Sequence, residues 1–302
     1  MNAILKRATN RNLSHLPQRR LALTIVAPAI LYYLLLRYYP VGRTLYLSFT
    51  DARLLSPTYD FVGAQNFANL LGDPVFRKVL WNTTYYAFVT TTVTTVLAFL
   101  VALLFDPIRR GVGMLRLIYY LPTVTSAIAI ATIWIWFYQP RFGLFNQILA
   151  FFSIPPISWL RSTEWAMPSL IIMSVWGGVG FSALIFIAGL KGIPNSYIEA
   201  ARIDGAAPWQ VAWHIKLPLL SRVITFVYVT GVIGSFQVFQ QVYLMTSGGP
   251  LNATRVLALA IYEDAFQHLK IGQAAATAFV LFVVVGVLTV IQLRIQRNDW
   301  EL

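Results

Sequence analysis

Six hydroxyl or amide side chains and one glycine, placed within otherwise apolar runs, carry the groups that could do chemistry in this sequence. Such groups donate and accept hydrogen bonds without a net charge, and nearby aromatic rings add flat apolar faces. This combination suits reversible binding of a hydroxyl-rich solute without a covalent step. The alternative is that these groups bond neighbouring helices, as they often do in bundles. The positions are Thr123, Ser174, Gly178, Ser235, Gln237, Gln240 and Gln241.

A run of hydroxyl groups from Thr90 to Thr95 is interpreted differently. Threonine hydroxyls in a membrane helix can bond the carbonyls of their own backbone, so this run needs no ligand. We expect it to serve helix packing. The polar residues between Ser235 and Gln241 would be costly in lipid, and we expect them to face protein or water.

Covalent, metal and nucleotide chemistry have little support in the residue types. The chain has no cysteine, and its three histidines, His15, His214 and His268, stand at no metal-ligand spacing. The phosphate-binding pattern G-x-x-x-x-G-K-[ST] does not occur in the sequence. The chain is therefore predicted to be no enzyme and to hold neither metal nor cofactor. If ATP and magnesium drive it, other chains bind them.

The elements that must position these residues are membrane helices. Hydrophobic residues make up 58% of the 302 residues and charged residues only 11%, which predicts an all-α polytopic membrane protein. A signal peptide is disfavoured for the first run, which has a long basic leader and no small-x-small cleavage pattern. Residues 21–293 would form one six-helix domain. The six apolar runs are Leu21 to Leu36, Val79 to Phe105, Leu117 to Pro140, Trp165 to Leu190, Val223 to about Leu244, and Ile271 to Leu293.

Basic residues predict the orientation of these helices. With the amino terminus inside, 14 of the 23 Lys and Arg residues lie in cytoplasmic segments, including residues 1–20 and 294–302. Both termini are then cytoplasmic. The net charge of +12 is explained by topology and by attraction to anionic lipid, so no nucleic-acid partner is expected.

A polar segment between the fourth and fifth runs, residues 196–218, is predicted to form a helical elbow. Ser196 and Glu199 have the spacing of a capping box, which would start a first helix. Gly205 can adopt the left-handed conformation that ends a helix, and Pro208 suits the first turn of a second. The second helix is expected to run to about Ile215 and to end at the Lys-Leu-Pro that follows. A solvated loop is the alternative, but the small residues at the corner favour docking of another protein.

The order of residues in this elbow resembles the EAA loop of ABC importer permeases. Glu199, Ala200 and Ala201 are followed by Gly205 and later by I-x-L-P at residues 215–218. The resemblance implies that this loop is the coupling helix, held in a cleft of an ATP-binding subunit. The residues expected to couple to the ATPase are Glu199, Ala200, Ala201, Asp204 and Gly205.

Further landmarks along the chain are similar to those of carbohydrate permeases of the maltose and glycerol-3-phosphate type. The resemblance implies the type I fold, located in a bacterial or archaeal cytoplasmic membrane. It also implies a second permease, usually a different polypeptide, together with two ATPase subunits and an extracytoplasmic solute-binding protein. The landmarks are FVGAQNF (61–67), DP (73–74), NT (82–83), YLP (120–122), GLFN (143–146) and TSGGP (246–250).

By the same resemblance, Thr123, Ser174, Gly178 and Gln237 align with sugar-contacting positions of the maltose-type permease. That permease has asparagine-rich contacts where this chain has Ser and Gln, so the sugar itself does not carry over. The long apolar runs contain no Asp, Glu, Lys or Arg, which favours a neutral sugar and an external energy source. The expected function is a sugar importer's permease subunit. Alternatives are glycerol-3-phosphate as cargo, an ion-coupled secondary carrier, or a membrane scaffold whose elbow docks a cytosolic protein.

Overall fold

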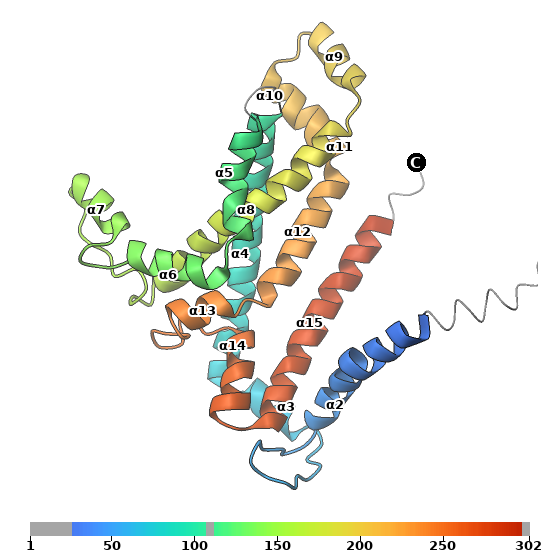
Figure 1. Ribbon diagram of the computed structural model, residues 1–302, viewed down its shortest axis with the longest axis vertical. Helices are drawn as coiled ribbons and strands as arrows, with labels where there is room; N and C mark the ends of the chain where they lie inside the picture. Colours follow the sequence, from blue (N-terminus) through green and yellow to red (C-terminus); the bar gives the residue numbers. More distant parts are fainter. Residues whose placement is uncertain (1–25, 107–111, 298–302) are drawn as a thin grey trace, which may run out of the picture.

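The computed structural model describes residues 26–106 and 112–297, and within these ranges every regular element is a helix. The helices form an elongated bundle (Figure 1). Two short helices, α9 (Asn195–Ile203) and α10 (Pro208–Val211), project at one tip, which we call the elbow end. At the opposite end lie α3 (Gln65–Gly72) and α14 (Leu257–Tyr262).

Three helices of the described ranges are long and apolar enough to cross a membrane. They are α4 (Pro74–Phe105), α8 (Ala166–Lys191) and α15 (Ile271–Arg297). A fourth crossing results if the helical segment Pro208–Leu219 and α12 (Ser221–Phe236), which meet at a bend of 70°, are counted as one span. The prediction of a helical membrane protein is confirmed. The 32 residues of α4 reach about 48 Å at 1.5 Å per residue, more than a hydrocarbon core of about 30 Å requires.

Helix α4 is the central element of the bundle. It begins at Pro74, five residues before the predicted apolar run, because the Asp73 side chain accepts the Val75 N–H at 2.8 Å and Pro74 occupies the first turn. Towards the elbow end, its small residues Ala98 and Ala102 are fully buried in one apolar cluster with Phe186 of α8. This close approach fixes α4 against α8.

Two of the predicted continuous helices are broken. The third run divides into α5 (Val112–Val124) and α6 (Ala127–Phe137), and the fifth divides into α12 and α13 (Gln240–Met245). At each break the last helical hydrogen bond spans three residues and not four. The Thr125 N–H donates to the Pro122 carbonyl, and the Gln237 N–H donates to the Gly234 carbonyl. Proline explains the first break, because it lacks an N–H and weakens the helix around it.

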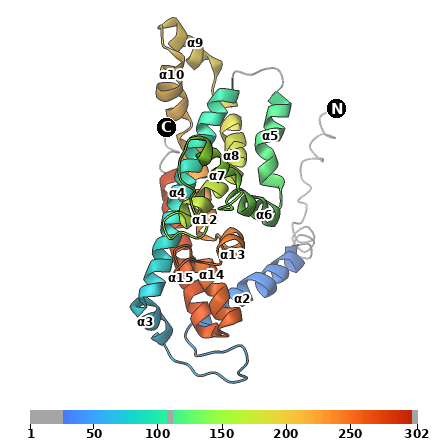
Figure 2. The same cartoon turned by 90° about the vertical axis from the view of Figure 1, so that its left-hand side faces the viewer.

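The first helix of the described chain lies apart from the others over most of its length. Residues 26–33 are helical, a π turn follows at Leu34–Tyr38, and α2 spans Tyr39–Leu47. Every residue from 26 to 43 is exposed. Figure 2 shows α2 diverging from the bundle near the end opposite the elbow. The residues of this apolar helix therefore lack cover from the described part of the chain.

Close packing of α5 on α8 depends on one glycine. A Cβ atom at Gly180 would lie 2.2 Å from the backbone oxygen of Tyr119. At Gly177, one turn earlier on the same helix, a Cβ atom would meet nothing within 4 Å. The helices can therefore touch only where α8 has no side chain.

We predict that Gly180→Ala destabilises the fold by about 1–3 kcal/mol, because the added methyl group overlaps backbone that cannot move aside easily. Gly177→Ala is the matched control and should be neutral or slightly stabilising, since alanine is the better helix former. Thermal unfolding of the two variants in the same detergent measures the difference. Equal melting temperatures would contradict the assigned contact.

Candidate functional site

A cavity of about 630 Å³ lies between α4, α8, α12 and the start of α13. All seven residues predicted for a solute pathway line it, namely Thr123, Ser174, Gly178, Ser235, Gln237, Gln240 and Gln241. They come from four helical segments and from the break that follows α12. The structure therefore brings these residues together, although their contact with solute remains a prediction.

The break after α12 adds irregular backbone to the glutamine side chains that line the cavity. Gln237 follows the last residue of α12, and Gln240 begins α13. On a continuous helix, residues 237, 240 and 241 would share one face. The break lets irregular backbone border the cavity as well, where water or solute can satisfy its polar groups.

The threonine run on α4 also lines this cavity, which the sequence analysis missed. Thr90, Thr91, Thr94 and Thr95 face it together with Tyr86. Their spacing of three to four residues is that of one helix face, and this periodicity could have revealed the shared direction. The run was interpreted as helix packing, and part of it does pack: Thr91 Oγ1 lies 3.3 Å from Ser235 Oγ.

Two observations separate the lining threonines from packing residues. Thr95 is 8% exposed and its hydroxyl has no hydrogen-bond partner among the described residues. A buried hydroxyl without a partner is costly, and a rotation of the side chain that turned this hydroxyl into the cavity would let a polar ligand remove that cost. Thr92, by contrast, points away from the cavity and lies within 3.2 Å of the Tyr228 hydroxyl.

The cavity lining is neutral. Its polar groups are threonine and serine hydroxyls, glutamine amides and one tyrosine, and it contains no Asp, Glu, Lys, Arg or His. Tyr86 donates a hydrogen bond to Ser174 at 2.7 Å, which fixes both side chains at the wall. Such a surface can hydrogen-bond a polyhydroxylated solute but cannot neutralise a phosphate or carboxylate.

At the elbow end, the first helix ends as the sequence predicts. Gly205 has a φ of +81°, and the Ala206 N–H bonds the Ala201 carbonyl while the Gly205 N–H bonds Arg202. This pair of bonds is a Schellman motif, which uses glycine in the left-handed conformation to end a helix. The start differs, because α9 begins at Asn195 without a side-chain cap. The predicted Ser196–Glu199 capping box is therefore wrong.

The second arm of the elbow is longer than predicted. Pro208 does occupy the first turn of α10, and Gln210 Oε1 accepts the Ala207 N–H at 2.7 Å. The helix then continues through a π turn at Ala212–Lys216 into α11 (Leu217–Leu219). The expected stop at Pro218 is wrong, because proline in the first turn after the π segment needs no hydrogen bond to its nitrogen.

The elbow exposes apolar residues at the tip of the bundle. Ile203 is 86% exposed and Trp209 66% exposed. Four of the five predicted coupling residues, Glu199, Ala200, Asp204 and Gly205, are exposed and Ala201 is half-buried. Apolar side chains presented next to charged ones at a projecting corner are characteristic of a protein contact.

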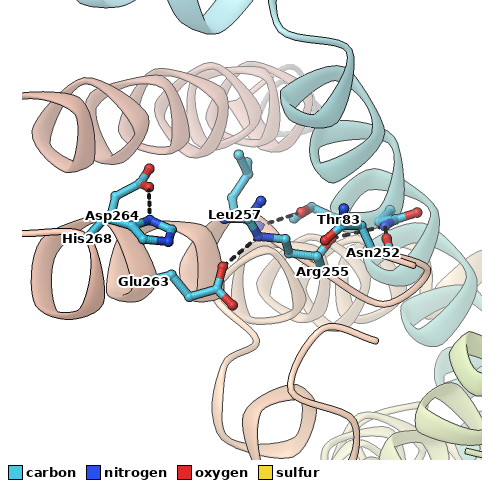
Figure 3. Close-up of polar contacts among 8 residues, drawn as sticks. Thr83, Asn252, Arg255, Leu257, Glu263, Asp264 and His268 are labelled. Atoms are coloured by element: carbon cyan, nitrogen blue, oxygen red, sulfur yellow. Dashed lines mark hydrogen bonds and ion pairs between the residues drawn. The ribbon is translucent and has the colours of Figure 1, made fainter. Parts of the chain in front are cut away.

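At the opposite end, side chains of α4 hold the loop between α13 and α14. Asn82 Nδ2 donates to the carbonyls of Asn252 and Arg255, and the Leu257 N–H donates to Thr83 Oγ1 at 2.9 Å. Figure 3 shows Thr83, Asn252 and Leu257 of this region beside two further polar contacts. One is the Arg255–Glu263 ion pair at 2.6 Å, and the other is a contact of 3.0 Å between His268 Nδ1 and Asp264 Oδ1, which lies in the π turn Glu263–Gln267.

Another asparagine closes the loops around α7 (Leu144–Phe151). Asn146 donates to the carbonyls of Pro140 and Ile157, and its Oδ1 accepts from Ile157 N–H and from Trp159 Nε1. All hydrogen-bonding capacity of this side chain is thus used within the loops. The NT and GLFN landmarks therefore fix loop structure.

No group of three or more His, Cys, Asp or Glu residues within the described ranges could hold a metal ion. His214 lies in the elbow and His268 near α14, while His15 lies outside the described residues.

Comparison with known proteins agrees with these features. Two relatives cover nearly the whole chain. The lactose transport system permease protein LacF of Rhizobium radiobacter is 34% identical, covering 90% of this chain and 93% of the relative. The sn-glycerol-3-phosphate transport system permease protein UgpA of Agrobacterium fabrum is 31% identical, covering 92% and 95%.

Solved structures share the fold over nearly the whole chain. One of them is a bacterial alginate ABC transporter in complex with an alginate pentasaccharide-bound periplasmic protein. The TM-score is 0.84 at 22% identity, with 97% of this chain and 99% of that chain covered. Residues 94–298 match the family described as binding-protein-dependent transport system inner membrane component. The chain belongs to this family of ABC transporter permeases, as its sequence motifs indicated.

Proposed function

We propose that this chain is the permease subunit of an ATP-driven, binding-protein-dependent sugar importer, and that the cavity bordered by α4 is part of the sugar's path. The observation that carries the proposal is the neutral, hydroxyl-rich lining of a cavity between apolar helices. Its volume of about 630 Å³ is sufficient for a small saccharide, since ligand pockets commonly occupy about 300–1,000 Å³.

The proposed topology has six crossings. The first run, which ends in α2, is one; α4, α8 and α15 are three more, and the broken pairs α5–α6 and α12–α13 supply the others. Residues 1–20, the 196–218 elbow and residues 294–302 then lie in the cytoplasm. The excess of Lys and Arg in those segments supports this orientation.

The elbow is proposed to dock an ATP-binding subunit, with Glu199, Ala200, Ala201, Asp204 and Gly205 at the contact. Exposed Ile203 and Trp209 provide apolar area at the same tip. ATP and magnesium would be bound by two such subunits and not by this chain. Closure of the ATPase pair would draw the elbows together and switch the cavity between inward and outward access.

Two further partners complete the proposed assembly. A second permease, a different polypeptide, would cover the exposed α2 helix and close the cavity from the other side. An extracytoplasmic solute-binding protein would dock at the end opposite the elbow, where Asn82 holds the loop before α14 in a fixed position. Lipid would surround the remaining apolar faces.

A neutral sugar is favoured over glycerol-3-phosphate by the cavity itself. A phosphate ester is held most strongly by the charged donors of lysine or arginine, and this lining offers neither; its N–H donors are neutral glutamine amides. The UgpA relative keeps glycerol-3-phosphate as the second candidate, in which case the partner permease would supply the charge. An ion-coupled carrier or a membrane scaffold requires no ATPase at the elbow. Co-purification of ATPase subunits therefore distinguishes the proposed importer from both alternatives.

We predict that Glu199→Lys and Gly205→Asp abolish binding-protein-stimulated ATP hydrolysis while membrane insertion is retained. The lysine reverses a charge at the contact, and the aspartate strains a backbone whose φ is +81°. Co-purification of the ATPase subunits should fall by roughly tenfold or more, which corresponds to about 1.4 kcal/mol of lost binding.

Glu164→Lys is the matched control, because it makes the same charge change at an exposed residue in the connection before α8. It should leave ATPase binding unchanged. Retained coupling in both elbow variants, or failure of the unmodified chain to bring down any ATPase subunit, would refute the proposed function.

For the cavity, we predict opposite effects of Thr95→Val on stability and on transport. The variant removes a buried hydroxyl that has no partner, so the melting temperature should stay the same or rise. Uptake should weaken several-fold, since a hydrogen bond to solute is worth roughly 0.5–1.5 kcal/mol. Uptake of radiolabelled lactose, maltose and glycerol-3-phosphate is measured in vesicles with the complete transporter.

Thr92→Val provides the control on the same helix, because Thr92 is exposed outside the cavity. It should leave uptake unchanged for every solute. If Thr95→Val also leaves uptake unchanged for the transported solute, the threonine face of α4 serves packing alone.

A further inference from the structure

The elbow is joined to α4 by a short ion pair. Lys216 Nζ lies 2.6 Å from Asp106 Oδ2, a distance at which the ammonium donates a charge-assisted hydrogen bond. Lys216 ends the π turn of the elbow, and Asp106 directly follows the last residue of α4. The side chains are 15% and 27% exposed, so water screens the pair less than it screens a surface ion pair.

An open groove separates the rest of the elbow from α4. Its volume is about 1,010 Å³, with Leu100, Leu103 and Leu104 of α4 among its lining and Ile198 and Trp209 among the elbow residues that face it. Asp106 and Lys216 line the same groove. The facing walls of the groove do not touch, although Leu217 at the end of the elbow packs against the apolar cluster that contains Ala98 and Ala102 of α4. The ion pair provides a direct polar contact across this gap.

Helix α4 can carry a displacement from the ion pair to the cavity. It is one uninterrupted helix from Pro74 to Phe105, whereas α12 meets the elbow segment at a bend of 70°. Thr95, at the cavity, is 11 residues before Asp106, or about 16 Å along the axis. A movement of the Asp106 end is therefore felt at the threonine face without a hinge between them.

We infer that Asp106 and Lys216 are positioning residues that couple the elbow to α4 during transport. The inference rests on the proposed function, because it assumes that an ATPase moves the elbow. The pair transmits that movement to the helix whose threonine residues form one wall of the cavity. Neither residue touches solute or nucleotide in this scheme.

The absence of cysteine from the chain permits a direct test. Spin labels are placed at Leu104→Cys on α4 and Trp213→Cys on the elbow, both on exposed side chains. The distance between the labels is measured in the assembled transporter, first without nucleotide and then trapped with ATP and vanadate. With the pair intact, elbow and α4 should move together, and the distance distribution should be the same in both states.

Asp106→Asn and Lys216→Met each remove one charge while keeping side-chain length. In both variants the distance distribution should shift or broaden after trapping, and binding-protein-stimulated ATPase activity should fall roughly fivefold or more. The exchanged pair, Asp106→Lys with Lys216→Asp, should restore a state-independent distance. Lys191→Met, which removes an exposed charge at the end of α8, should behave as the unmodified chain.

The outcomes separate this inference from the proposed function. A transporter that hydrolyses ATP and shows the same state-independent distance in the Asn and Met variants overturns the inference alone. So does an exchanged pair that folds and binds the ATPase but fails to restore the distance. An unmodified chain that binds no ATPase overturns the proposed function, and the inference with it.

Discussion

The need to satisfy every backbone hydrogen bond away from water is the constraint on which this structure depends. Within a hydrocarbon layer an unpaired N–H or carbonyl costs several kcal/mol, so irregular backbone is tolerated only beside protein or a water-filled space. The break between α12 and α13 follows this rule, because Gln237, Val238 and Phe239 line the cavity. The break between α5 and α6 lies at the exposed residues Thr125 and Ser126, beyond the lining residue Thr123. After α12, the apolar bundle thus opens its backbone next to its polar cavity.

The same rule applies to two loop regions away from the elbow, where side chains replace missing backbone partners. Asn82 and Thr83 hold the loop before α14 at the end opposite the elbow, and Asn146 holds the loops around α7 at the side of the bundle. An amide has a donor and an acceptor on one short side chain, so a single asparagine can fix two or more loop segments. That economy accounts for asparagine in both landmarks.

Features set by local backbone chemistry could be predicted from the sequence. Gly205 ends α9 and Pro208 begins α10, because each depends on residues within one turn. Asp73 with Pro74 starts α4 by the same kind of local rule, which the apolar run from Val79 did not reveal. The Ser196–Glu199 spacing also satisfied a local rule, but the N-cap position of α9 is Pro194, two residues before Ser196, so the capping geometry is lost. The helix continues past Lys216 because a π turn precedes Pro218 and shifts the hydrogen-bond pattern of the backbone. No short sequence pattern predicts such a turn.

Features set by neighbouring helices could not be predicted in this way. The seven cavity residues were found because amides and hydroxyls are conspicuous in apolar runs, whereas the α4 threonines were assigned to packing. Both readings are correct for parts of one helix: Thr92 contacts Tyr228, while Thr95, three residues later, borders the cavity without a partner. Sequence alone cannot decide which side of a helix lipid, protein or water will occupy.

The neutral cavity and the charged elbow have separate roles in the proposed transport: uncharged groups contact the solute, and charged groups lie at the helix end. A charge at mid-membrane would bind ions and hold an anionic solute tightly, and it would cost several kcal/mol in apolar surroundings. Placing Asp106 and Lys216 at the helix end avoids that cost, since water still reaches both side chains. In the proposed scheme, movement of the elbow reaches α4 through this intact ion pair at the helix end, while the cavity offers only weak, neutral hydrogen bonds. A solute held by such bonds can leave again, as a pathway requires.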